Sequence, residues 1–197
     1  MSKRNKSHKN VFYDSSFKVE EQLPRNFSVT FKEIGVGSKG EVRVIFNNES
    51  QVGDIINDNS YINDFYRYHD IFHYTFAAML GWSPCARAMM KRKRKSNQQV
   101  DEIEDGARAT ITEEAISLIL FNDAKGKNFY EEQKVSKELI EQIKDMAGSF
   151  EVRDKTEKDW ENAIMKAYEL FRNLKQNGGG KIVFDMLNKN IQFIAQN

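Results

Sequence analysis

The sequence predicts an α+β protein that is mainly α, with a helical core flanked by an N-terminal and a C-terminal β-hairpin. Apolar and polar residues alternate over 27–34 and 41–46, on either side of the glycine-rich segment 35–40, and this pattern is typical of a hairpin. A second pair of such stretches lies within 181–195. Between the hairpins, over 61–176, apolar residues recur with a period of about 3.6, as in helices. Strands and helices do not alternate, so we expect the hairpins to be able to pair in one small antiparallel sheet.

The chain divides into four segments of one globular domain. The N-terminal segment is basic and shows no clear period, so we expect a flexible arm. The four segments are an arm over 1–26, a hairpin and connector over 27–60, a helical core over 61–176 and a hairpin over 177–197.

Start and stop signals divide the core into four or five helices. Ser136 is a predicted N-cap, and Thr156 with Asp159 resembles a capping box. Gly81 and Gly148 mark two helix ends, and the glycines at 178–180 mark a third. The expected helices cover 64–80, 84–95, 101–124, 136–147 and 156–176.

Composition excludes several classes of protein. Hydrophobic residues make up 40% and charged residues 30% of the chain, so it is neither collagen-like nor wholly disordered. The net charge of +1 gives no overall field that would attract nucleic acid or a membrane surface. No segment approaches the roughly 18 apolar residues of a membrane span, and the one cysteine, Cys85, cannot form an internal disulfide. We therefore expect a cytoplasmic protein, with no membrane association and no nucleic-acid partner.

The glycine-rich segment 35–40 matches the pattern G-x-G-x-x-G. That pattern binds dinucleotides only where a helix follows it, and here the predicted strand 41–46 follows. Glu41 also stands where a phosphate-binding loop would have lysine. We therefore interpret the segment as a hairpin turn.

A group of polar residues interrupts the first long apolar helix. His69, Asp70 and His73 are spaced i, i+1 and i+4, so they can share one face. Burial of an unpaired carboxylate is costly. The residues are therefore either satisfied core side chains or part of a site.

Acidic residues gather on the predicted helix 101–124. Glu114 falls in a stripe with Ile103 and Leu118 that is expected to face the core, and Glu113 is its neighbour. A buried pair with Arg or His is the alternative for Glu114. Glu102 and Asp105 lie near the helix start. Compensation of the helix dipole is sufficient to explain acidic residues at these positions.

The basic run 91–95 is the candidate phosphate contact. The alternative interpretation of this run is a solvated C-terminal end of a helix, where positive side chains interact favourably with the helix dipole. Two helices that carry acids into a shared interior can build a metal site, and oxygen ligands select Mg²⁺ or Mn²⁺. Such ions assist phosphate chemistry.

Residues 66–124, which include YRYHDIFHYTFAAMLGWSPCARAMMKRKRKS and VDEIEDGARATITEEAISLILFNDA, resemble the MazG-like branch of the all-α NTP pyrophosphohydrolases. The resemblance implies a helical core that binds Mg²⁺ through acids on two helices, written E-E-x-x-E and E-x-x-D. It also implies hydrolysis of a nucleoside triphosphate, NTP or dNTP, to the monophosphate and pyrophosphate. A homodimer or higher homo-oligomer is expected.

The resemblance suggests a role for each candidate residue. We expect metal ligation by Asp70, Glu113 and Glu114, catalytic roles for His69, His73, Glu102 and Asp105, and polyphosphate contacts from Lys91, Lys93, Arg94 and Arg108.

The sequence departs from the family pattern at three positions. His69, His73 and Ser117 stand where acids are expected. Imidazole ligands weaken Mg²⁺ binding and suit Mn²⁺ or another transition metal better. The departures also leave two other hypotheses open: a non-catalytic protein that binds nucleotides or regulates, and an interaction or nucleic-acid accessory module that uses the basic run.

Overall fold

The computed structural model describes residues 12–34 and 40–195. Most of the predicted glycine turn, residues 35–39, and the start of the predicted arm, residues 1–11, lie outside the described residues. None of the helices in the described ranges is long and apolar enough to cross a bilayer.

Both predicted hairpins are present, and they join in one antiparallel sheet, as expected. The strands are β1 (Asn26–Ile34), β2 (Glu41–Phe46), β3 (Ser50–Gln51), β4 (Ile56–Asn57), β5 (Gly179–Asp185) and β6 (Asn190–Ile194). Their order is β3-β2-β1-β5-β6, and β4 pairs with β2. Phe31 of β1 lies opposite Val44 of β2 on one side and Gly180 of β5 on the other. The N-terminal and C-terminal hairpins therefore meet where β1 pairs with β5.

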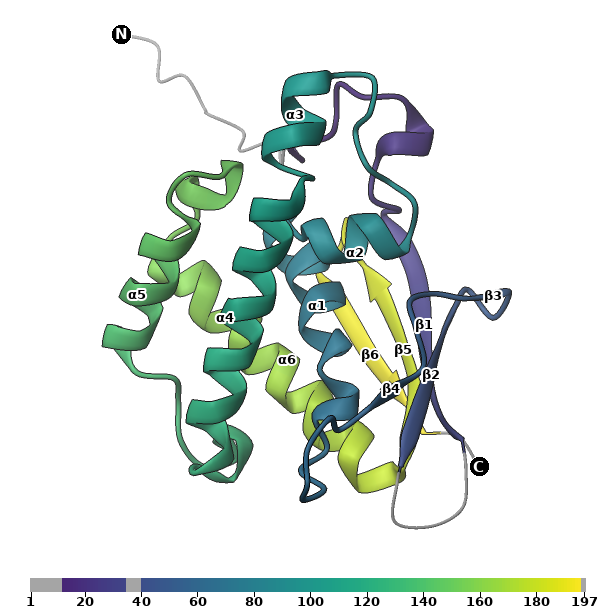
Figure 1. Ribbon diagram of the computed structural model, residues 1–197, viewed down its shortest axis with the longest axis vertical. Helices are drawn as coiled ribbons and strands as arrows, with labels where there is room; N and C mark the ends of the chain where they lie inside the picture. The colour runs from purple at the N-terminus through teal and green to yellow at the C-terminus, as the bar shows by residue number, and fades with distance from the viewer. Residues whose placement is uncertain (1–11, 35–39, 196–197) are drawn as a thin grey trace, which may run out of the picture.

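The α-helices lie on one side of this sheet (Figure 1). They are α1 (Asp70–Leu80), α2 (Pro84–Met89), α3 (Gln98–Ile103), α4 (Ala107–Lys125), α5 (Lys137–Ala147) and α6 (Glu157–Asn177). Short 3-10 turns lie at Val19–Glu21, Tyr66–Tyr68, Asn128–Tyr130 and Glu151–Asp154. Helices α1 and α6 pack together beside the sheet, and α4 and α5 form the outer layer (Figure 1). Phe72 and Phe171 stack between α1 and α6 with ring centroids 6.2 Å apart, within the core.

The predicted caps form as the sequence indicates. The Ser136 side chain accepts a hydrogen bond from the Leu139 N–H. Thr156 and Asp159 form the complete capping box at the start of α6. Gly178 ends α6 with a positive φ of 63°, a conformation that glycine adopts without steric cost.

The predicted helix 101–124 is divided in two. Helix α3 ends at Ile103, α4 begins at Ala107, and Gly106 between them is extended. A Cβ atom on Gly106 would overlap the carbonyl of Glu102. The Asp105 side chain turns toward Arg94, so the helix breaks where this carboxylate enters the interior.

Two other helix boundaries differ from the prediction. The first helix begins at Asp70 rather than 64, because Phe65 has a positive φ of 71° and a 3-10 turn follows it. The second ends at Met89, and Lys91 has a φ of 57°. The basic run 91–95 therefore lies outside the helix and is not a helix end.

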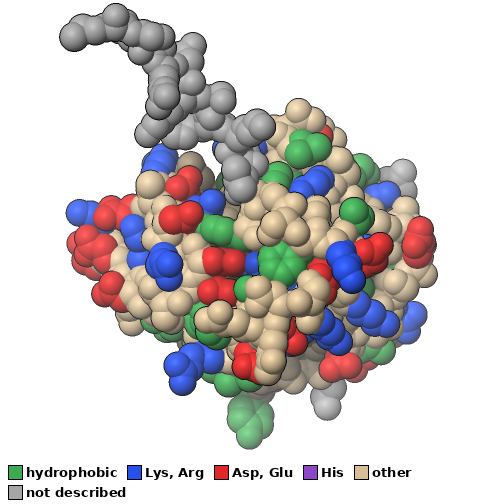
Figure 2. Space-filling view, turned by 90° about the horizontal axis from the view of Figure 1, so that it is seen from above, with side chains coloured by type: hydrophobic (Ala, Val, Ile, Leu, Met, Phe, Trp, Pro, Cys, Tyr) green, Lys and Arg blue, Asp and Glu red, His purple; other side chains and the backbone are tan. Residues whose placement is uncertain are grey.

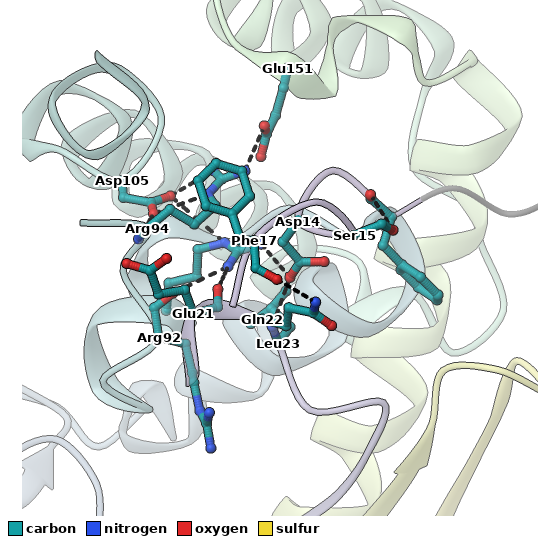
Figure 3. A network of polar contacts seen from close by, with 12 residues as sticks. Asp14, Ser15, Phe17, Glu21, Gln22, Leu23, Arg92, Arg94, Asp105 and Glu151 are labelled. Atoms are coloured by element: carbon teal, nitrogen blue, oxygen red, sulfur yellow. Dashed lines mark hydrogen bonds and ion pairs between the residues drawn. The ribbon is translucent and has the colours of Figure 1, made fainter. Parts of the chain in front are cut away.

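The described part of the predicted flexible arm, residues 12–26, is packed against the core. Asp14 is buried, and its carboxylate binds Arg25 and Arg87 at 2.5 Å and 2.9 Å. Figure 3 shows how this network continues to Arg94 and Asp105. The buried ion pairs fix a segment that lacks any hydrophobic period, which explains why pattern alone missed it.

Candidate metal centre

The start of α1 and the second turn of α4 bring together the polar groups that interrupted both apolar patterns. His69 and Asp70 begin α1, and His73 lies one turn farther along the same face. One ligand atom of each of these three residues lies within 4.8 Å of the other two. Glu113 and Glu114 of α4 complete the cluster, with contacts to His73 at 2.9 Å and 3.4 Å.

Glu113 is the structural anchor of the cluster. It is 0% exposed. One carboxylate oxygen accepts a hydrogen bond from the Ser83 hydroxyl at 2.6 Å, and the other from the Cys85 backbone N–H at 2.8 Å. Its contact with His73 Nδ1 at 2.9 Å fixes the ring. Because both oxygens of Glu113 are engaged, we interpret this residue as a support for His73.

Both histidine rings direct Nε2 toward Glu114. His69 Nδ1 lies 3.0 Å from the carbonyl of Tyr66, which can only accept, so this nitrogen carries the proton. The Tyr66 ring stacks on His69 with centroids 4.2 Å apart. His69 Nε2 lies 4.0 Å and His73 Nε2 3.4 Å from the two oxygens of Glu114. The two ring nitrogens therefore flank a single carboxylate.

The groups of the cluster shift one another's pKa. Burial raises the pKa of Asp70 and lowers that of His69. Burial alone would lower the pKa of His73, but Glu113 and Cys85 together outweigh it and raise that pKa well above 6.5. A contact with His73 holds the pKa of Glu114 down to about 2. Glu114, whose side chain is 46% exposed, is therefore an anion at neutral pH.

Comparison with known families identifies this architecture. The family model of the MazG C-terminal domain matches residues 8–197. The chain belongs to this family. No curated protein and no solved structure matches it. The match extends the resemblance of residues 66–124 to both hairpins, so the sheet is part of the MazG C-terminal domain.

This MazG C-terminal domain places Asp105 and Arg94 with each other rather than in the cluster. Asp105 is 0% exposed, and Arg94 binds it from its backbone N–H, Nε and Nη2 at 2.7 Å, 3.1 Å and 2.7 Å. Arg94 Nη1 binds Glu151 at 2.8 Å, and Arg87 approaches Asp105 within 3.7 Å. These residues form the network of Figure 3, which joins the α2–α3 connection to the N-terminal segment.

The other predicted catalytic and phosphate-binding residues lie nearer the surface. Glu102 is exposed on α3, where it accepts a hydrogen bond from Gln98. Lys91 and Arg108 are exposed, and Lys93 is half-buried. Figure 2 shows Lys and Arg side chains scattered among Asp and Glu side chains on the face seen from above. None of these four residues belongs to the groups with metal-ligand spacing within the described ranges.

The apolar stripe of α4 is rotated by one residue from its predicted position. Glu113, not Glu114, faces the core, together with Ile116. Leu118, which the prediction buried, is exposed on α4, and Ile103, also predicted as buried, is exposed at the end of α3. One residue corresponds to about 100° around a helix. The prediction therefore placed Glu114 in the core, where the structure places Glu113.

The sequence did not predict that Ser83, Cys85 or Tyr66 would join the cluster. Ser83 caps α2 by accepting a hydrogen bond from the Ala86 N–H, and it also donates to Glu113. The Ser83–Pro84 pair is a recognisable helix-start signal. Its second role depends on packing between α2 and α4, which the sequence does not reveal.

The donor set does not match the preference of Mg²⁺. Mg²⁺ prefers an octahedron of oxygen ligands. The group formed by His69, Asp70 and His73 offers two imidazoles and one carboxylate. A second group, His73, Cys85 and Glu114, offers an imidazole, a thiol and a carboxylate.

Proposed function

We propose that this MazG-like protein is a nucleotide pyrophosphohydrolase that uses a divalent cation and cleaves an NTP or dNTP to the monophosphate and pyrophosphate. The observation that carries the proposal is the convergence of α1 and α4 on one cluster, in which Glu114 stays ionised and open to solvent beside two imidazoles. Family membership supports the same class of reaction.

In the proposed reaction, a water oxygen bonds to the α-phosphorus while the bond from that phosphorus to the α,β-bridging oxygen breaks. Pyrophosphate leaves with the bridging oxygen, and the water proton passes to solvent. Glu114 accepts a hydrogen bond from this water and orients it. Its lowered pKa makes it a weak base, so orientation is its main contribution. Lys91, Lys93 and Arg108 remain the proposed polyphosphate contacts. Arg94 is left out because Asp105 and Glu151 engage all of its guanidinium nitrogens.

One observation favours a second candidate, a protein that binds nucleotides without hydrolysing them. Glu113, predicted as a metal ligand, has both carboxylate oxygens engaged by Ser83, Cys85 and His73. This leaves Asp70 and Glu114 as the carboxylates of the cluster that are free to meet a ligand.

Pyrophosphate release from a panel of NTPs and dNTPs, with Mg²⁺ or Mn²⁺, tests the proposal. Glu114→Gln removes the charge that orients water and should lower kcat/KM by at least about 100-fold. Glu132→Gln is the matched control, because Glu132 is exposed and distant in sequence from the cluster.

Two outcomes would contradict the hydrolase. A folded wild-type protein that releases no pyrophosphate with any nucleotide or ion leaves the binding protein as the better hypothesis. Full activity in Glu114→Gln would remove the cluster from the reaction.

A further inference from the structure

Two histidines of the cluster are held as metal ligands are held. In metal sites, a ligating histidine usually uses its other ring N–H to bond a carboxylate or a backbone carbonyl. His73 Nδ1 contacts the Glu113 carboxylate at 2.9 Å, and His69 Nδ1 contacts the Tyr66 carbonyl at 3.0 Å. Both kinds of support are therefore present, one for each ring.

Of the two remaining ring nitrogens, the Nε2 of His73 is buried without a hydrogen-bond partner. His73 is 1% exposed, and its Nε2 makes no hydrogen bond. Among the described residues, none donates a hydrogen bond to the Asp70 carboxylate, which is 6% exposed. Its polar neighbour is His69 Nε2 at 3.4 Å. Buried polar groups normally have partners, so the buried His73 Nε2 without a hydrogen bond, close to the Asp70 carboxylate, indicates a missing ligand.

We propose that this place binds a divalent transition-metal ion through His69, Asp70 and His73, in preference to Mg²⁺. Imidazole nitrogen binds ions such as Mn²⁺, Co²⁺ and Zn²⁺ better than it binds Mg²⁺. Two histidines and one carboxylate also leave coordination positions open, as catalytic sites require.

Glu114 is the group beside the ion rather than a fourth ligand. Its two oxygens lie 3.4 Å and 4.0 Å from the histidine Nε2 atoms, and its side chain is the exposed member of the cluster. A water on an open coordination position would lie within its reach. The inference rests on the proposed function, because it concerns the same site. Ion binding is measured without turnover, so the two are tested separately.

The experiment uses the untagged chain of 197 residues after removal of bound metal. Competition titrations would compare Co²⁺, Zn²⁺, Mn²⁺ and Mg²⁺, with visible absorption reporting Co²⁺ coordination. We expect Co²⁺ and Zn²⁺ to bind at least about 100-fold more tightly than Mg²⁺. His69→Gln and His73→Asn should each remove most of this preference. His8→Asn changes the remaining histidine of the sequence. It is the matched control and should retain the preference for Co²⁺ and Zn²⁺.

Two further variants test the ligand assignment. Glu113→Gln should weaken Co²⁺ binding by about 10–100-fold, as expected for a residue that supports a ligand. Cys85→Ser should leave it unchanged, because Cys85 belongs to the alternative group with His73 and Glu114. Circular dichroism establishes that each variant is folded. His69 is less buried than His73, so it provides a folded variant if the other fails.

Several outcomes would overturn the inference. These are Mg²⁺ binding as tightly as Co²⁺, unchanged Co²⁺ binding in folded His69→Gln, or loss of binding in Cys85→Ser. Failure of the proposed function can be distinguished from failure of this inference. An inactive protein that still prefers Co²⁺ supports the ion site and not the reaction.

Discussion

Replacement of Asp105 by asparagine should destabilise the protein by about 3 kcal/mol. Asp105 is fully buried and accepts three hydrogen bonds from Arg94 at 2.7–3.1 Å. Asparagine keeps the shape but removes the charge and directs an N–H₂ group at the guanidinium. Loss of one partner from a buried ion pair costs about 3–5 kcal/mol. The lower value applies because Arg94 keeps Glu151 at 2.8 Å.

Urea unfolding followed by circular dichroism measures this loss. For a chain of this length, about 3 kcal/mol lowers Tm by roughly 6–12 °C. Glu102→Gln is the matched control, since it removes an exposed carboxylate from the same segment and should cost less than about 0.5 kcal/mol. A loss below about 1 kcal/mol for Asp105→Asn, or equal losses for the two variants, would refute the structural role of Asp105.

Two other predictions concern the backbone and acid stability. Gly179 has a φ of 116°, and a Cβ there would overlap the Phe31 carbonyl; Gly179→Ala should cost at least about 2 kcal/mol. Gly126→Ala, with open space around its Cβ, should be neutral or slightly stabilising in the same urea unfolding assay, and similar losses for the two variants would count against the argument. Burial raises the pKa of Asp14, but Arg25 and the other hydrogen bonds lower it further, below 3.8. Its contribution to stability is therefore present above that pH and is lost as pH falls through the lowered pKa. Asp14→Asn should flatten the fall of unfolding free energy in acid, and an unchanged slope would contradict this.

Local signals in the sequence predicted most of the secondary structure. Ser136 and Thr156 cap their helices, and Gly178 ends α6, because these interactions join residues only a few positions apart. The alternating pattern over β1 and β5 likewise predicted that these segments are strands. Such features depend on nearest neighbours, so the sequence contains the information needed.

Boundaries that depend on distant partners were predicted less well. The break between α3 and α4 follows from the Asp105 carboxylate, which reaches Arg94 in another segment. The N-terminal segment is fixed by Asp14 through Arg25 and Arg87. Neither pairing has a periodic signal, because an ion pair needs one residue from each partner and no repeat.

In the candidate site too, local spacing was predictable from the sequence and contacts between distant segments were not. The spacing of His69, Asp70 and His73 alone placed three polar groups on one face of a helix. Helical geometry fixes such a spacing wherever the helix lies.

The sequence alone thus determined the chemistry available to this MazG-like protein: two imidazoles and an aspartate on one helix, and adjacent glutamates on another. Only the tertiary structure decided their roles. Packing of α2 against α4 directs Ser83 and Cys85 at Glu113, which turns that residue into a support for His73 and leaves Glu114 at the surface. The physical reason is that a one-residue rotation of α4 exchanges a buried carboxylate for an exposed one, and contacts between helices set that rotation.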